Sequence, residues 1–161
     1  MLAVLAAGIL DLLLDGPPAG ILLRGYAPDP VTLVTVWLAL RSEAWAACAG
    51  GFFLGFLRDG ISAGPAGGWA LVLVLQALLV KAVTRSVEIN RPWSAAFTAF
   101  AAVLAGTVVF YPLLMYVYAG MNPVRVIYQH FSIYCIQGIL TACLSLPVYG
   151  LLDRMAGERG E

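Results

Sequence analysis

Long apolar stretches alternate with short polar ones along the whole chain. No residue between Asp59 and Lys81 is formally charged, and the same holds between Arg91 and Arg125 and between Arg125 and Asp153. A helix rises about 1.5 Å per residue, so each of these stretches is long enough to cross roughly 30 Å of hydrocarbon. The pattern therefore predicts a polytopic membrane protein.

Turn-forming residues divide the apolar stretches into six predicted helices. Consecutive prolines at Pro17 and Pro18 end the first helix, and Pro30 suits the first turn of the second. The polar residues 41–43 predict a tight interfacial turn, and Pro112 predicts a kink in the fifth helix. We expect one membrane domain, residues 1–161, with helices at about residues 2–14, 31–40, 44–57, 65–83, 94–118 and 128–152. The second and third are short for membrane-spanning helices.

Composition supports a lipid environment and excludes some functions. The chain is 61% hydrophobic and 11% charged, whereas a soluble domain carries about 25% charged residues. The formal net charge is zero, so no basic surface is predicted for nucleic acid. All three cysteines fall within predicted helices, where buried thiols act as small apolar groups.

The basic residues are distributed unevenly among the predicted loops. Six helices place both termini on one side of the membrane. If that side is the cytoplasm, the inner segments hold Arg41, Lys81, Arg85, Arg91, Arg154 and Arg159, and the outer segments hold Arg24, Arg58 and Arg125. Because basic residues favour the cytoplasmic side, this asymmetry predicts that both termini are cytoplasmic.

No motif in the chain predicts catalysis. There is no phosphate-binding loop, zinc-protease motif or nucleophile elbow. His130 is the only histidine, so the chain alone cannot supply a histidine metal site or a Ser-His-Asp arrangement. We expect no catalytic residue, no metal and no cofactor.

Four polar residues of the apolar helices allow two interpretations each. Asp11 and Asp15 share one helix face, where they would bind a cation or, as the following prolines favour, mark a wet helix end. Gln76 and Gln137 lie in the middle of predicted helices. They would either join two helices through a hydrogen bond or line a ligand cavity.

The most informative stretch is the glycine-rich segment 50–68, together with the residues just before it. Ala47, Gly51 and Gly55 form a stripe of small residues at helical spacing, which lets two helix backbones approach closely in lipid. The stripe would receive a partner's transmembrane helix or pack against the protein's own helices. Arg58 and Asp59 follow, either as an interfacial pair with a snorkelling arginine or with the carboxylate turned inward to cap the glycine turn.

Three parts of the chain carry a family resemblance. The first is Pro28-Asp29-Pro30-Val-Thr-Leu-Val-Thr-Val-Trp-Leu-Ala-Leu-Arg41, the second is Gly51-Phe-Phe-Leu-Gly55-Phe-Leu-Arg-Asp59 followed by Gly64-Pro65-Ala-Gly67, and the third is Asp153-Arg154 after the last apolar helix. In these parts, and in its length, the chain resembles the bacterial rod shape-determining protein MreD family.

The resemblance implies a function and a fold. It implies a non-enzymatic, multi-pass scaffold of the cell inner membrane that binds an MreC-type periplasmic protein. Through that partner it would act indirectly on the elongation peptidoglycan synthases and on the actin-like filament. It also implies a six-helix bundle related to the substrate-binding subunits of energy-coupling-factor transporters. The residues expected to serve partner binding or helix packing are Gly51, Gly55, Asp59, Gly64 and Gly67.

The same relation supplies an alternative function, the capture of a vitamin by a transporter subunit. Such a subunit needs polar side chains that converge from the outer loops on a cavity. The chain offers Asn122, Tyr128, Gln129 and His130 for that purpose. A polar cavity among these residues would distinguish the alternative from the scaffold.

Overall fold

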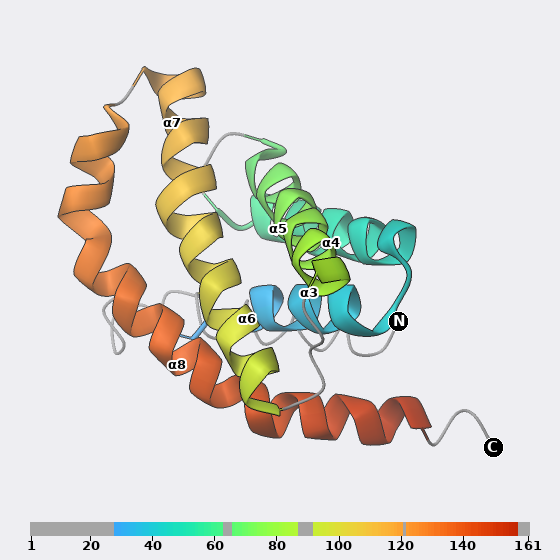
Figure 1. Ribbon diagram of the computed structural model, residues 1–161. Coiled ribbons are helices and arrows are strands. Elements are labelled where there is room, and N and C mark those ends of the chain that lie inside the picture. The colour runs from blue at the N-terminus through green and yellow to red at the C-terminus, as the bar shows by residue number, and fades with distance from the viewer. Residues whose placement is uncertain (1–27, 63–65, 87–91, 121, 158–161) are drawn as a thin grey trace.

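The computed structural model describes residues 28–62, 66–86, 92–120 and 122–157, and within them the protein is all-helical (Figure 1). The helix expected at residues 2–14 lies outside this part, as do Asp11, Asp15 and Gly64. The elements are α3 (Pro30–Arg41), α4 (Ala44–Asp59), α5 (Gly68–Ser86), α6 (Pro92–Leu104), the π-helix η1 (Ala105–Phe110), α7 (Tyr111–Ala119) and α8 (Pro123–Gly157).

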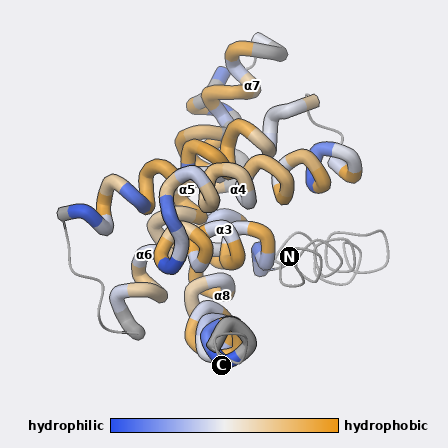
Figure 2. Tube along the Cα trace, turned by 90° about the vertical axis from the view of Figure 1, so that its right-hand side faces the viewer, coloured by the Kyte–Doolittle hydropathy of each residue, from blue (hydrophilic) through white to orange (hydrophobic). Residues whose placement is uncertain are grey.

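Three stretches of the described helices are long and apolar enough to cross a membrane. They are Gly68–Arg85 in α5, Ser94–Val117 in α6 to α7, and Phe131–Arg154 in α8. Figure 2 shows hydrophobic colours over most of these helices. With 12 and 16 residues, α3 and α4 extend only about 18 and 24 Å. The described residues thus contain three candidate spans, and α3 and α4 are shorter than the roughly 30 Å of a typical hydrocarbon layer.

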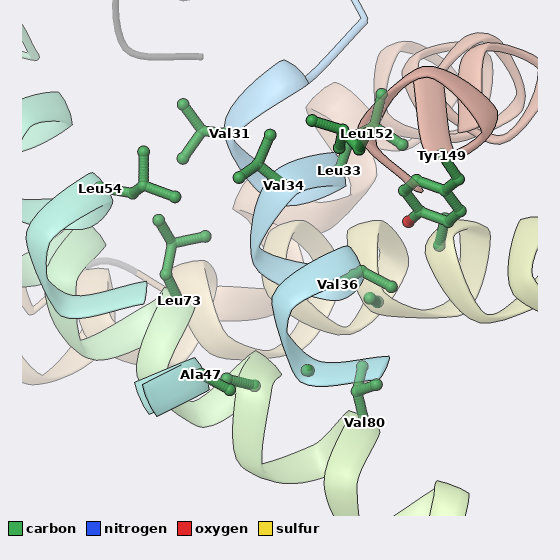
Figure 3. Close-up of a cluster of buried hydrophobic side chains, with 14 residues drawn as sticks. Val31, Leu33, Val34, Val36, Ala47, Leu54, Leu73, Val80, Tyr149 and Leu152 are labelled. Atoms are coloured by element: carbon green, nitrogen blue, oxygen red, sulfur yellow. The ribbon is translucent and has the colours of Figure 1, made fainter. Parts of the chain in front are cut away.

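The short helix α3 forms the centre of the core. Every residue from Pro30 to Val36 is buried, as expected for a helix that is apolar on all sides. Figure 3 shows Val31, Val34 and Val36 surrounded by side chains from three other helices, namely Leu54 of α4, Leu73 and Val80 of α5, and Tyr149 and Leu152 of α8. Helices that are distant in sequence therefore meet around α3.

Glycines bring α4 and α5 into backbone contact. A Cβ atom added to Gly55 would lie 2.3 Å from the Cα atom of Ala70, and one added to Gly51 would lie 3.1 Å from the carbonyl oxygen of Leu73. No side chain fits at either position without moving the backbone. The stripe of small residues thus faces the protein's own helix α5.

The long helical arm made of α6, η1 and α7 contains an irregular stretch. Gln76 of α5 donates a hydrogen bond from Nε2 to the carbonyl oxygen of Ala102, at 2.7 Å. A Cβ atom on Gly106 of η1 would lie 2.0 Å from that Nε2 atom, so the glycine makes room for the amide. Gln76 therefore joins two helices, one of the two expected roles, and the π-helix directly precedes the helix that holds Pro112.

The last helix is longer than the expected 128–152 and runs beside α6 and α7. In Figure 1 it changes direction in its last third, and Pro147 lies in that part of α8. A proline inside a helix removes one backbone hydrogen bond and bends the axis. The bend brings the end of α8 alongside α3.

Candidate functional site

Helix α3 begins in the interior of the protein, at Asp29. This residue is 2% exposed, and its backbone N–H donates to Oγ1 of Thr141 at 2.9 Å. Thr141 lies well inside the candidate span Phe131–Arg154 of α8. The first turn of α3 is therefore held against the middle of that apolar stretch, inside the helix bundle.

A helix end buried in the protein needs partners for its free N–H groups, because neither water nor lipid can supply them there. Pro30, the first residue of α3, has no N–H. Oδ1 of Asp29 accepts from the backbone N–H of Thr32 at 3.0 Å, and the carbonyl of Asp29 accepts from Leu33 at 3.2 Å. The Thr32 hydroxyl donates to Oδ2 of Asp29 at 2.8 Å. Asp29 thus supplies acceptors for the N–H groups of both Thr32 and Leu33 at the buried helix start.

Arg58 of α4 neutralises the Asp29 carboxylate. Its guanidinium lies 2.9 Å from Oδ2 of Asp29, and the two side chains are 10% and 2% exposed. The guanidinium also lies 4.0 Å from the centre of the Trp69 ring of α5, an arrangement that adds cation–π attraction. The guanidinium is therefore enclosed by helices and does not extend into water as a snorkelling arginine would. It is a buried cation that links α4 to α3 and α5.

The neighbouring residue Asp59 has different partners. Its carboxylate accepts hydrogen bonds from the backbone N–H groups of Trp69, at 2.9 Å, and Ala70, at 3.2 Å. It therefore caps the N-terminus of α5, as the inward-turned carboxylate of the second interpretation would. Just before α5, Gly67 has a φ of 82°, a left-handed conformation that favours glycine.

The opposite end of α3 carries a second ion pair. Arg41 contacts Oδ2 of Asp153 at 2.5 Å, and the indole N–H of Trp37 donates to Oδ1 of the same carboxylate at 3.0 Å. Asp29 with Thr141 and Arg41 with Asp153 are each separated by 112 residues in the sequence. Helix α3 and the end of α8 therefore run in parallel. The two contacts align the helices with the same offset of 112 residues at both ends of α3.

The arrangement is suited to positioning helices rather than to catalysis. A buried ion pair contributes little net stability, but removing one partner is costly, so it specifies which groups must meet. Within the described residues, no group of three or more His, Cys, Asp or Glu side chains is placed to hold a metal ion. The Asp29–Arg58 pair joins four helices and is the candidate functional site.

Sequence reasoning missed this pair, although two signals pointed to it. Asp29 directly precedes a proline that begins an apolar helix, which is a strong N-cap signal. Arg58 lies in the last turn of α4, a short apolar helix. Charges beside such short helices have to be neutralised inside the protein. The sequence spacing of the two residues says nothing about their contact.

A comparison with protein families matches nearly the whole chain. The family model of the rod shape-determining protein MreD matches residues 1–155. The matched range contains the Asp29–Arg58 pair, the Arg41–Asp153 pair and the glycine stripe of α4. No curated protein and no solved structure matches the chain.

Proposed function

Because the chain belongs to the MreD family of rod shape-determining proteins, we propose that it is a non-enzymatic scaffold of the bacterial cell-elongation machinery in the inner membrane. It binds an MreC-type periplasmic protein, and through that partner it helps to position the peptidoglycan synthases and the actin-like filament. The family match and the apolar helices support this role. The rest of the proposal concerns which surface meets the partner and which side of the membrane it faces.

The burial of Arg58 strengthens the argument from basic residues for cytoplasmic termini. Arg58 is buried against Asp29, so it no longer counts as a loop residue in the positive-inside comparison. Of the three basic residues assigned to the outer segments, Arg24 and Arg125 remain, against six assigned to the inner segments. In this orientation Gly67, just before α5, lies on the periplasmic side.

The outward face of α4 is the proposed partner surface. Phe52, Phe53 and Phe56 are 51%, 63% and 63% exposed, and the rings of Phe52 and Phe56 stack with their centres 6.4 Å apart. On the other side of the same helix, Gly51 and Gly55 are fixed against α5. These glycines therefore contribute to partner binding by holding α4 in place, while the aromatic face offers a ridge on which a partner's transmembrane helix can pack.

The vitamin-capture alternative gains no support. Asn122 and Tyr128 are exposed near the start of α8, rather than gathered around a cavity. The side chains of Gln129 and His130 lie outside the described part of the structure. The family match concerns rod shape, so we carry only the scaffold function forward.

We predict that replacing Phe53 and Phe56 together with alanine abolishes function while the protein still folds. In a rod-shaped host that lacks its own family member, the wild-type chain should restore rods and the double variant should leave the cells round. Co-purification of the MreC-type partner should fall about tenfold or more, because aromatic side chains at the centre of an interface each contribute more than about 1 kcal/mol.

Phe97→Ala is the matched control, because Phe97 of α6 is 71% exposed on another helix. This variant should restore rods and retain the partner. If the double variant also restores rods and retains the partner to the same extent as Phe97→Ala, the α4 face is excluded as the partner surface.

A further inference from the structure

An open pocket of about 450 Å³ lies between the ends of α3 and α8. It is lined by Trp37, Leu38, Arg41, Ser42 and Asp153. The candidate span of α8 ends at Arg154, directly after the pocket residue Asp153. The pocket therefore lies at the end of an apolar stretch, and Trp37 is a residue type that is common where hydrocarbon gives way to lipid headgroups.

The pocket presents one positive and one negative group side by side. The side chain of Arg41 is 62% exposed and that of Asp153 is 37% exposed, so both are accessible to a ligand. The Asp153 carboxylate accepts one hydrogen bond on each oxygen, from Trp37 and from Arg41. A carboxylate has about four acceptor positions, so it can also accept from a further donor. Arg41 has five N–H donors and is suited to phosphate.

We propose that this pocket binds the headgroup of phosphatidylethanolamine. The lipid phosphate contacts Arg41, and the primary ammonium donates to Asp153. Trp37 and Leu38 lie against the glycerol and the first acyl carbons. The proposal rests on the membrane location of the chain and is independent of which partner α4 binds.

Charge and hydrogen bonding favour this headgroup over other phospholipids. A phosphatidylglycerol headgroup has the phosphate for Arg41 but brings no cation to the carboxylate of Asp153. A phosphatidylcholine headgroup has a cation, but its trimethylammonium has no N–H to donate. Of these three headgroups, only phosphatidylethanolamine brings both a phosphate and an ammonium with N–H groups, and hydrogen bonds between charged groups are the stronger ones.

The test is a competition among lipids for the purified full-length chain. Phosphatidylethanolamine, phosphatidylcholine and phosphatidylglycerol with identical acyl chains are added in equal amounts, and the bound lipid is counted by native mass spectrometry. We expect phosphatidylethanolamine to be retained roughly threefold to tenfold over each of the others. Its mono- and dimethylated forms should bind progressively less well.

Three variants assign the preference to the pocket. D153N should remove the discrimination between phosphatidylethanolamine and phosphatidylcholine, and R41Q should weaken the binding of all three lipids. E43Q is the matched control, because Glu43 is exposed near the same end of the protein but does not line the pocket. It should keep the wild-type preference.

Equal retention of phosphatidylethanolamine and phosphatidylcholine by the wild-type chain would overturn the proposal. Preferential retention of phosphatidylglycerol would overturn it as well, because it would indicate a site for anionic lipid. The series of methylated lipids uses the unmodified protein, so a variant that fails to fold does not prevent a decision. A preference that persists in D153N would show that Asp153 does not receive the ammonium.

Discussion

Arg58→Met should lower the free energy of unfolding by about 3–5 kcal/mol, because it leaves the Asp29 carboxylate buried without its cation. Asp29 is 2% exposed at the start of α3, where neither water nor lipid can replace the guanidinium. Unfolding of the purified chain in mixed micelles measures the loss. Arg41→Met is the matched control, because Arg41 is 62% exposed in its ion pair with Asp153 and should cost no more than about 1 kcal/mol.

A second substitution separates the charge from the cap. In Asp29→Asn the side-chain oxygen can still accept from Thr32, while the negative charge is gone. Combined with Arg58→Met, it should recover much of the stability that Arg58→Met loses, because no buried charge is left unpaired. If Arg58→Met lowers the free energy of unfolding no more than Arg41→Met does, the Asp29–Arg58 pair is not buried as described.

Gly55→Ala should lower the free energy of unfolding by about 3 kcal/mol, at the upper end of the usual cost of overpacking. The new methyl group would lie 2.3 Å from the Cα atom of Ala70, and a backbone atom cannot turn away as a side chain can. The two helices therefore have to separate. Thermal unfolding of the purified variant measures the effect.

Substitutions at two other glycines should have smaller effects on stability, in the order of the space around them. At Gly51 the added atom would lie 3.1 Å from a carbonyl oxygen of α5, so Gly51→Ala should be intermediate in cost. At Gly150 of α8 no atom lies within 4 Å, so Gly150→Ala should be neutral or should gain up to about 1 kcal/mol from helix propensity. Equal stability of the variants at Gly55 and Gly150 would contradict the packing of α4 on α5.

The features that could be predicted from the sequence are those that depend on residues close together in the chain. The break between α3 and α4 follows from the polar residues 41–43, and proline and glycine act on the backbone directly. A capping role for Asp59 was one of two interpretations of that residue, because it is adjacent to the glycine turn, and its actual partners are the first N–H groups of α5. In each case the partners are at most about a dozen residues apart.

Features that depend on tertiary contacts were not accessible in the same way. Asp29 and Arg58 belong to different helices, and only the assembled bundle shows that they meet. The stripe with Gly51 and Gly55 has the same spacing whether it faces a partner or the protein itself. Its direction depends on the position of α5, which places Ala70 and Leu73 against it.

The polar core and the proposed function are connected through α4. Arg58 ties the end of this helix to α3, and Asp59 ties it to the start of α5. Gly51 and Gly55 then seat one side of α4 against α5, so that Phe53 and Phe56 point away from the bundle. The central claim is that the protein fixes α4 in order to present this aromatic face to its partner.

Site-specific photo-crosslinking in native membranes tests that claim most directly. A photoreactive amino acid is placed singly at Phe53, at Phe56 and, as a control for an exposed position on another helix, at Phe97. We predict crosslinks to the MreC-type partner from the two positions on α4 and none from Phe97. Crosslinks to that partner from Phe97, with none from Phe53 or Phe56, would contradict the account.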